Sequence, residues 1–159
     1  MKDKDSKPYL EVIEETIKHY KNEIIVFPRY EKQREVILEK FEGQVTIPSG
    51  GFHFLDMLSK ANVVITGGGT MARESALLGV PSITYFWRYL EPQAYIEERG
   101  FPSFSAQTIP DTKKIIKKIC SKPDQYWIDT SKKLATLEKP SDVLIPLMKQ
   151  DKKLKEYFK

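Results

Sequence analysis

Two hydrophobic patterns alternate along the first 120 residues of the chain. Short apolar runs rich in β-branched residues, such as Val63-Val64-Ile65, are typical of strands buried on both faces. Between them, apolar residues recur every three to four positions, which is typical of amphipathic helices. Strands are predicted at residues 23–28, 44–48, 63–66, 82–86 and 102–106. Helices are predicted at residues 8–20, 32–41, 52–61, 70–78, 93–99 and 109–120.

This alternation predicts an α/β fold, because parallel strands need crossover connections that helices supply. We expect a Rossmann-like parallel sheet with helices on both faces, and a single domain over residues 1–159. The charged residues 1–6 are expected to be disordered. Residues 121–159 are expected to form a helical C-terminal extension that folds back over one face, with helices at 129–138 and 141–149.

The predicted order of elements has one irregularity, because the chain opens with a helix. A doubly wound half usually begins with its innermost strand. The sheet is therefore expected either to be complete, with five strands in the order 2-1-3-4-5, or to lack an upstream strand.

Three consecutive glycines follow the strand that begins at Val63. Gly67, Gly68 and Gly69 lack Cβ atoms, so the backbone can turn sharply and a ligand can approach its amides closely. Thr70 can cap the following helix, whose free N–H groups and positive dipole end favour an anion. These four residues are predicted to bind a phosphate at the carboxyl end of a strand, where open parallel sheets bind ligands. The alternative is that the glycines only make a tight turn.

The amino-acid composition argues against nucleic acids, metals and membranes as binding partners. The chain has 159 residues and a net charge of +4, and its lysine clusters lack the interleaved aromatics of a nucleic-acid surface. Cys120 is the only cysteine, and the two histidines, His19 and His53, are far apart, so no metal is expected. No apolar run approaches the roughly 20 residues of a membrane span. We therefore expect a cytoplasmic protein with no membrane span and no nucleic-acid partner.

The stretch from Val45 to Ala94 resembles the carboxyl-terminal half of nucleotide-sugar enzymes with the GT-B fold, especially the UDP-N-acetylglucosamine 2-epimerase group. The phrase Gly-Gly-Gly-Thr-Met-Ala-Arg-Glu, which begins at Gly67, is also similar to a family of largely archaeal proteins called DUF354. The resemblance covers about residues 8–120.

The resemblance to the epimerases implies several site residues. The diphosphate falls on the turn at 67–70, where Gly68 replaces the epimerase serine and Thr70 is expected to supply the hydroxyl. Glu74 takes the place of the glutamate that binds the ribose, and Phe54 that of an aromatic beside the base, with His53 adjacent. Two alternatives stay open: Glu74 pairs with a nearby cation, Arg73 or Lys60, and Phe54 belongs to the core.

Three arginines are further candidates for ligand contacts. Arg73 lies in the first turn of its helix, where the dipole disfavours a cation. This position suggests an anionic partner, such as a phosphate or a carboxylate, and a solvated side chain is the open alternative. Arg29 follows a predicted strand at its carboxyl end. The epimerase phrase Arg-Pro-Glu appears here as Glu91-Pro92-Gln93, which removes its arginine, although Arg88 is close by.

These residues predict a nucleotide-sugar-binding domain that catalyses nothing alone, because no catalytic constellation stands out. The presumed ligand is a UDP-sugar, with no other cofactor. The parent activity is expected to be glycosyl transfer or sugar-nucleotide epimerisation, with an N-terminal half-domain on another chain or a homo-oligomer as partner.

Two other functions stay open. The spacing Gly67-x-Gly69-x-x-Ala72 fits a dinucleotide fingerprint, with Arg88 suited to a 2′-phosphate, and so allows an NAD(P)-dependent oxidoreductase. A non-catalytic interaction module could use the aromatic segment 87–90 and an unpaired sheet edge.

Overall fold

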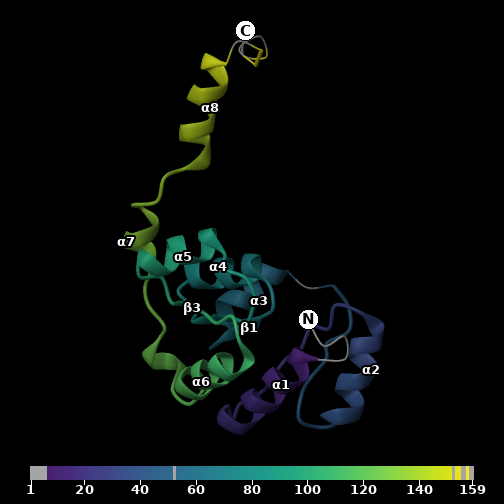
Figure 1. Ribbon diagram of the computed structural model, residues 1–159. Coiled ribbons are helices and arrows are strands. Elements are labelled where there is room, and N and C mark those ends of the chain that lie inside the picture. Colours follow the sequence, from purple (N-terminus) through teal and green to yellow (C-terminus); the bar gives the residue numbers. More distant parts are fainter. Residues whose placement is uncertain (1–6, 52, 152, 155–156, 158–159) are drawn as a thin grey trace. The chain divides into compact units, whose positions relative to one another are not determined.

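The computed structural model describes residues 7–51, 53–151, 153–154 and 157 (Figure 1). The disorder expected for residues 1–6 lies outside these residues. The chain divides into two compact units, of which the first ends at Asp129 and the second begins at Thr130. The expectation of one domain over residues 1–159 stays a prediction, and the two units are described separately.

The first unit contains a three-stranded parallel sheet. Strands β1 (Val64–Thr66), β2 (Ser82–Thr84) and β3 (Ser103–Ser105) lie in the order β1-β2-β3. Their register places Ile65 beside Ile83, and Ile83 beside Phe104. The sheet confirms the predicted α/β class and its parallel strands.

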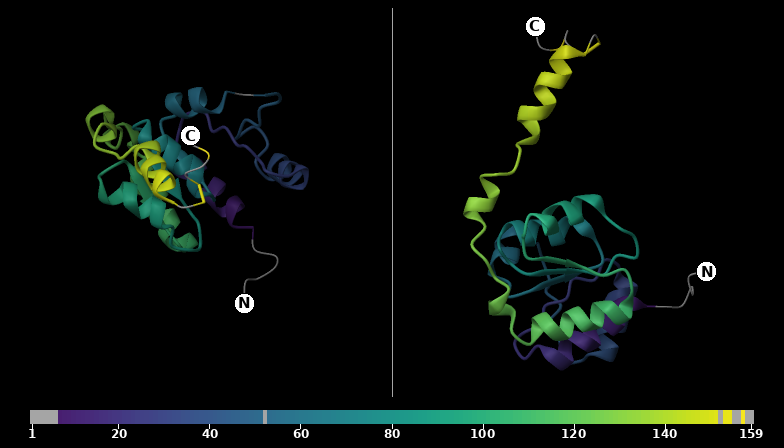
Figure 2. Two further views of the ribbon diagram at one scale, coloured as in Figure 1. Left: turned by 90° about the horizontal axis from the view of Figure 1, so that it is seen from above. Right: turned by 60° about the vertical axis from the view of Figure 1, so that its left-hand side comes forward.

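Helices cover both faces of this sheet, as predicted. Helices α4 (Gly69–Leu77) and α5 (Glu91–Glu98) lie on one face, with α3 (Phe54–Lys60) packed against α4. Helices α1 (Pro8–His19) and α6 (Ile109–Cys120) lie on the opposite face, as the right-hand view of Figure 2 shows.

The core follows the amphipathic pattern of α1 and α6. Val12, Ile83, Ile116, Ile119 and Cys120 form one buried cluster between the sheet and these helices. A neighbouring side of α1 faces a second cluster, in which Ile13 meets Ile37 and Phe41 of the segment that contains α2 (Glu31–Lys40). Helix α1 therefore connects α2 to the sheet.

The prediction of strands at 23–28 and 44–48 was wrong for the described structure. These segments share a single parallel bridge between Ile25 and Thr46, and the described sheet has three strands rather than five. Val26 packs against the α1–α2 cluster, whereas Ile25 and Phe27 are 44% and 38% exposed. The apolar run is thus covered on one side only, so it does not behave as a buried strand.

The second unit is helical. It contains α7 (Ser131–Leu134) and α8 (Pro140–Gln150), and no described residue of either helix is buried. Helix α7 is shorter than the predicted helix 129–138, because the amides of Thr136 and Leu137 donate to carbonyls three residues earlier, as in turns, and not four. The predicted helix 141–149 is confirmed as α8. None of the described helices combines the length and apolar character needed to cross a membrane.

Candidate functional site

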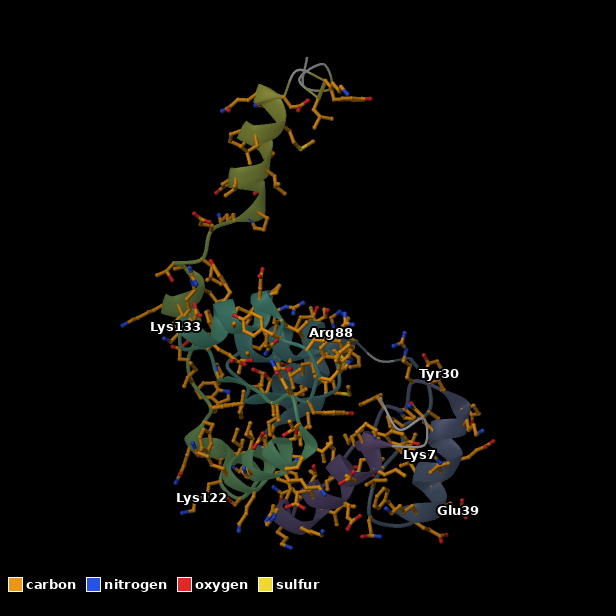
Figure 3. All side chains as sticks on the ribbon, in the orientation of Figure 1. Lys7, Tyr30, Glu39, Arg88, Lys122 and Lys133 are labelled. Atoms are coloured by element: carbon orange, nitrogen blue, oxygen red, sulfur yellow. The ribbon has the colours of Figure 1, made fainter. Side chains whose placement is uncertain are left out.

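The candidate site lies at the carboxyl ends of the parallel strands. The turn at Gly67 and Gly68 joins β1 to α4, and the loop 85–90 joins β2 to α5. Both connections leave the sheet at the same edge, because parallel strands point the same way. Arg88, on the second of these loops, is labelled in Figure 3.

The first and third glycines make room for the protein's own side chains. A Cβ atom at Gly67 would lie 3.3 Å from the ring of Tyr85. A Cβ atom at Gly69 would lie 2.6 Å from Nη1 of Arg73 and 2.9 Å from Cδ1 of Leu90. A side chain at Gly67 would press on the ring of Tyr85, whereas the atoms beside Gly69 are the ends of flexible side chains that can move.

The second glycine faces open space. The nearest heavy atom to a Cβ atom at Gly68 would be Oγ1 of Thr66, at 3.9 Å, which is an ordinary contact. Nothing in this part of the first unit therefore requires glycine at 68 for packing. A ligand that approaches the turn closely would require it.

Helix α4 begins at Gly69 with Gly68 as its N-cap, and no side chain caps it. The prediction that Thr70 caps this helix was therefore wrong. Helical geometry leaves the amides of Gly69, Thr70 and Met71 without an intrahelical acceptor. The amide of Gly68 is already used, because it donates to Oγ1 of Thr66 at 3.1 Å.

Arg73 folds back over the start of its own helix. Its Nη2 donates to Oγ1 of Thr70 at 3.4 Å, and its Nη1 lies beside Gly69. Arg73 makes no ion pair with any carboxylate in the described ranges. A cation at the positive end of a helix is destabilising unless an anion accompanies it.

Glu74 lies one helical turn beyond Thr70 and is half-buried. Among the ion pairs of the described residues, none joins Glu74 to Arg73 or Lys60, so the surface pairing considered from the sequence does not form. The structure thus brings Thr70, Arg73 and Glu74 together on the first two turns of α4.

The remaining predicted residues have contacts elsewhere. Phe54 packs against the buried cluster that contains Leu58 and makes an edge contact with Phe27, with ring centroids 5.7 Å apart. His53 pairs with Asp56 at 3.2 Å. The guanidinium of Arg29 lies 5.4 Å from the ring centroid of Tyr30, and that of Arg88 lies 3.9 Å from the ring centroid of Trp87. Within the described residues, none of these contacts involves the turn at 67–70.

A pocket next to the turn was missed in the sequence. It is a cavity of about 20 Å³, room for a single small polar group, and lies between the ends of β2 and β3 and helix α5. Its lining includes Thr84, Arg88, Tyr89, Leu90 and Gln93. The available signal was Thr84, a polar residue in a strand that is expected to be buried.

A chain of hydrogen bonds runs beside this pocket. Nε2 of Gln93 donates to Oγ of Ser103, and Ser103 in turn donates to Oε1 of Glu97 at 3.4 Å. Ser105 donates to Oε2 of Glu97 at 3.2 Å. Burial raises the pKa of Glu97, and the hydrogen bonds from Ser105 and Ser103 oppose that rise.

Nothing in the described part of the chain resembles a metal centre, since no group of three or more potential ligands is found there. Burial raises the pKa of Cys120 to about 12, so this thiol belongs to the core and not to a reactive site.

Comparison with known proteins gives one family and one relative. The chain matches the family described as "Protein of unknown function (DUF354)" over residues 3–152. It is 36% identical over 75 residues to the uncharacterized protein MJ0665 of Methanocaldococcus jannaschii. That match covers 47% of this chain and 21% of the relative. No solved structure matches.

Proposed function

Because the chain belongs to the DUF354 family of proteins of unknown function, we propose its role from its own site: the first unit binds a nucleotide sugar through the turn at 67–70. The diphosphate would lie on the amides of Gly69 and Thr70, and the open side of Gly68 would admit it. The observation that carries this proposal is Arg73, a cation held over the start of α4 with no described carboxylate to neutralise it.

A diphosphate suits these groups on physical grounds. Helix N-termini bind phosphates through unpaired N–H groups and the helix dipole, and arginine forms charge-assisted hydrogen bonds to phosphate oxygens. The carboxylate of Glu74, on the same turns of α4, could accept hydrogen bonds from both ribose hydroxyls. The resemblance to the epimerase group favours UDP as the nucleotide, with Phe54 and His53 as candidate contacts for the base.

The activity that we propose for the complete enzyme is glycosyl transfer or sugar-nucleotide epimerisation of the GT-B type. Both reactions need the charge of the departing diphosphate to be stabilised, which the turn and Arg73 could provide. A second half-domain or another copy of the chain would supply the remaining groups.

Thermal unfolding with UDP, UDP-N-acetylglucosamine and NADPH tests the proposal. The uridine ligands should stabilise the protein, by about 2.7 kcal/mol at 100 times the dissociation constant. Stabilisation by NADPH alone would instead support the dinucleotide alternative based on Gly67, Gly69 and Ala72.

Two arginine variants make the same experiment specific to the site. Arg73→Ala should weaken UDP binding at least tenfold, because it removes the cation that faces the phosphates. Arg34→Ala is the matched control, since Arg34 lies on α2 and pairs with Glu31 at 3.6 Å. Equal affinities for UDP in the wild type and Arg73→Ala would rule out the turn as the diphosphate site.

A further inference from the structure

Two buried polar atoms in the pocket beside the turn have no hydrogen-bond partner among the described residues. They are Oγ1 of Thr84 and Oε1 of Gln93. Both residues line the pocket, and each is only 1% exposed. Buried polar atoms are nearly always paired, so these two are expected to meet a group from outside the chain.

The hydrogen bonds around Gln93 define what that group must be. Ser103 donates its hydroxyl hydrogen to Glu97, so its oxygen accepts from Nε2 of Gln93. This hydrogen bond orients the side-chain amide of Gln93, and its Oε1 is an acceptor without a donor. The group that satisfies Gln93 must donate a hydrogen bond, whereas the hydroxyl of Thr84 can donate or accept.

A hydroxyl group meets both requirements, and a phosphate does not. The diphosphate of a nucleotide sugar offers only acceptor oxygens at neutral pH, so it cannot donate to Oε1 of Gln93. Arg88 also lines the pocket, but an anion attracted by its charge would leave that oxygen without a donor. The rings of Phe86 and Tyr89 line the same pocket and offer apolar surface to the carbon skeleton of a ligand.

We propose that this pocket binds a hydroxyl group of the sugar, which donates to Oε1 of Gln93 and is held from the other side by the hydroxyl of Thr84. This inference rests on the proposed nucleotide-sugar function and names the residues that distinguish a sugar-bearing ligand from the bare nucleotide. Leu90 lies next to both the pocket and the turn at 67–70. It lines the pocket, and its Cδ1 would lie 2.9 Å from a Cβ atom at Gly69. The sugar of a ligand whose diphosphate occupies the turn would therefore reach a neighbouring cavity.

The test compares UDP with UDP-glucose and UDP-N-acetylglucosamine by calorimetry on the full chain. The wild type should bind at least one UDP-hexose about tenfold more tightly than UDP, as expected for an added pair of hydrogen bonds. Thr84→Val keeps the shape of the side chain but removes its hydroxyl, and should abolish most of this advantage without changing the affinity for UDP. Thr84→Ser, which keeps the hydroxyl, should restore it.

Thr112→Val is the matched control. Thr112 is also fully buried, but its Oγ1 donates to the carbonyl of Thr108 at 2.8 Å. Losing a paired hydroxyl should lower the melting temperature and leave both affinities unchanged. Thr84→Val should instead leave the melting temperature of the free protein equal or higher, since an unpaired buried hydroxyl is destabilising. A drop like that of Thr112→Val would overturn the inference.

The side-chain amide signal of Gln93 in an ¹⁵N–¹H NMR spectrum gives a second measurement that does not depend on UDP. Glucose or N-acetylglucosamine at high millimolar concentration should shift this signal in the wild type, and less in Thr84→Val. No shift with any sugar, or equal losses of UDP and UDP-hexose affinity in Thr84→Val, would reject the sugar pocket. Failure of UDP to bind, with the Gln93 shift retained, would reject only the diphosphate proposal.

Discussion

Gly67 and Gly68 are adjacent residues with different surroundings. A Cβ atom at Gly67 would meet the ring of Tyr85 at 3.3 Å, whereas one at Gly68 would meet nothing closer than 3.9 Å. Tyr85 is partly buried, and burial raises the pKa of its hydroxyl. The same substitution should therefore have different effects at the two positions.

Gly67→Ala should destabilise the protein by on the order of 1 kcal/mol, because an extra methyl group overpacks the contact with Tyr85. Gly68→Ala should change stability by less than about 0.5 kcal/mol, since a weaker N-cap is offset by reduced unfolded-state entropy. Urea denaturation measures both. In UDP titrations, Gly68→Ala should lose more affinity than Gly67→Ala, because the methyl group at position 68 enters the space of the ligand. Equal stabilities of the two variants would contradict the assignment of Gly67 to packing and Gly68 to ligand binding.

At the scale of elements, α1 and α6 pack through both apolar and charged contacts. Ile116 is fully buried against α1 and β2, and Lys113 pairs with Glu11 of α1 at 2.6 Å. The ion pair is exposed to solvent, and exposed ion pairs contribute little to stability. The apolar contact should therefore dominate the packing of these helices.

Ile116→Ala should lower the free energy of unfolding by about 2–5 kcal/mol, because it leaves a cavity in the core. Glu11→Gln should lower it by less than about 1 kcal/mol. Chemical denaturation of both variants at moderate salt decides between the two contributions. A larger loss from Glu11→Gln would show that charge, and not apolar burial, holds α1 in place.

The elements that were predicted correctly depend on patterns among residues that are close together in the sequence. The apolar period of 109–120 and the Gly-Gly-Gly-Thr turn were enough to place α6 and the start of the candidate site. The segment 23–28 was misread because an apolar run does not reveal whether both of its sides are covered. The pocket at Thr84 and Gln93 could not be predicted, since it depends on how β2, β3 and α5 meet in space.

At the scale of the whole molecule, the core of the first unit contains its own reporter. Cys120 is 2% exposed and lies in the cluster shared by α1, β2 and α6. A reagent can reach its thiol only when these elements separate. The reactivity of this cysteine should therefore follow the opening of the fold.

Alkylation of Cys120 by iodoacetamide at pH 8 should be orders of magnitude slower in the native protein than in urea, and its rate should rise with urea concentration. Burial raises the folded pKa to about 12, whereas an unfolded thiol titrates near about 8.5. The unfolded chain thus loses a proton that the native chain keeps, so this group's contribution to stability is complete below about pH 8.5 and declines from there to about pH 12. Native labelling as fast as unfolded labelling would refute the burial of this thiol.

The unequal surroundings of the glycines also allow relatives to be sorted by inspection of their sequences. A homologue that no longer binds the ligand could have a larger residue at the position of Gly68 and still keep the same fold. Replacement at the position of Gly67 should instead coincide with a smaller residue opposite it, where Tyr85 stands here. Glycine at the middle position of a relative would then indicate ligand binding, whereas glycine at the first position would indicate only the packing of the chain.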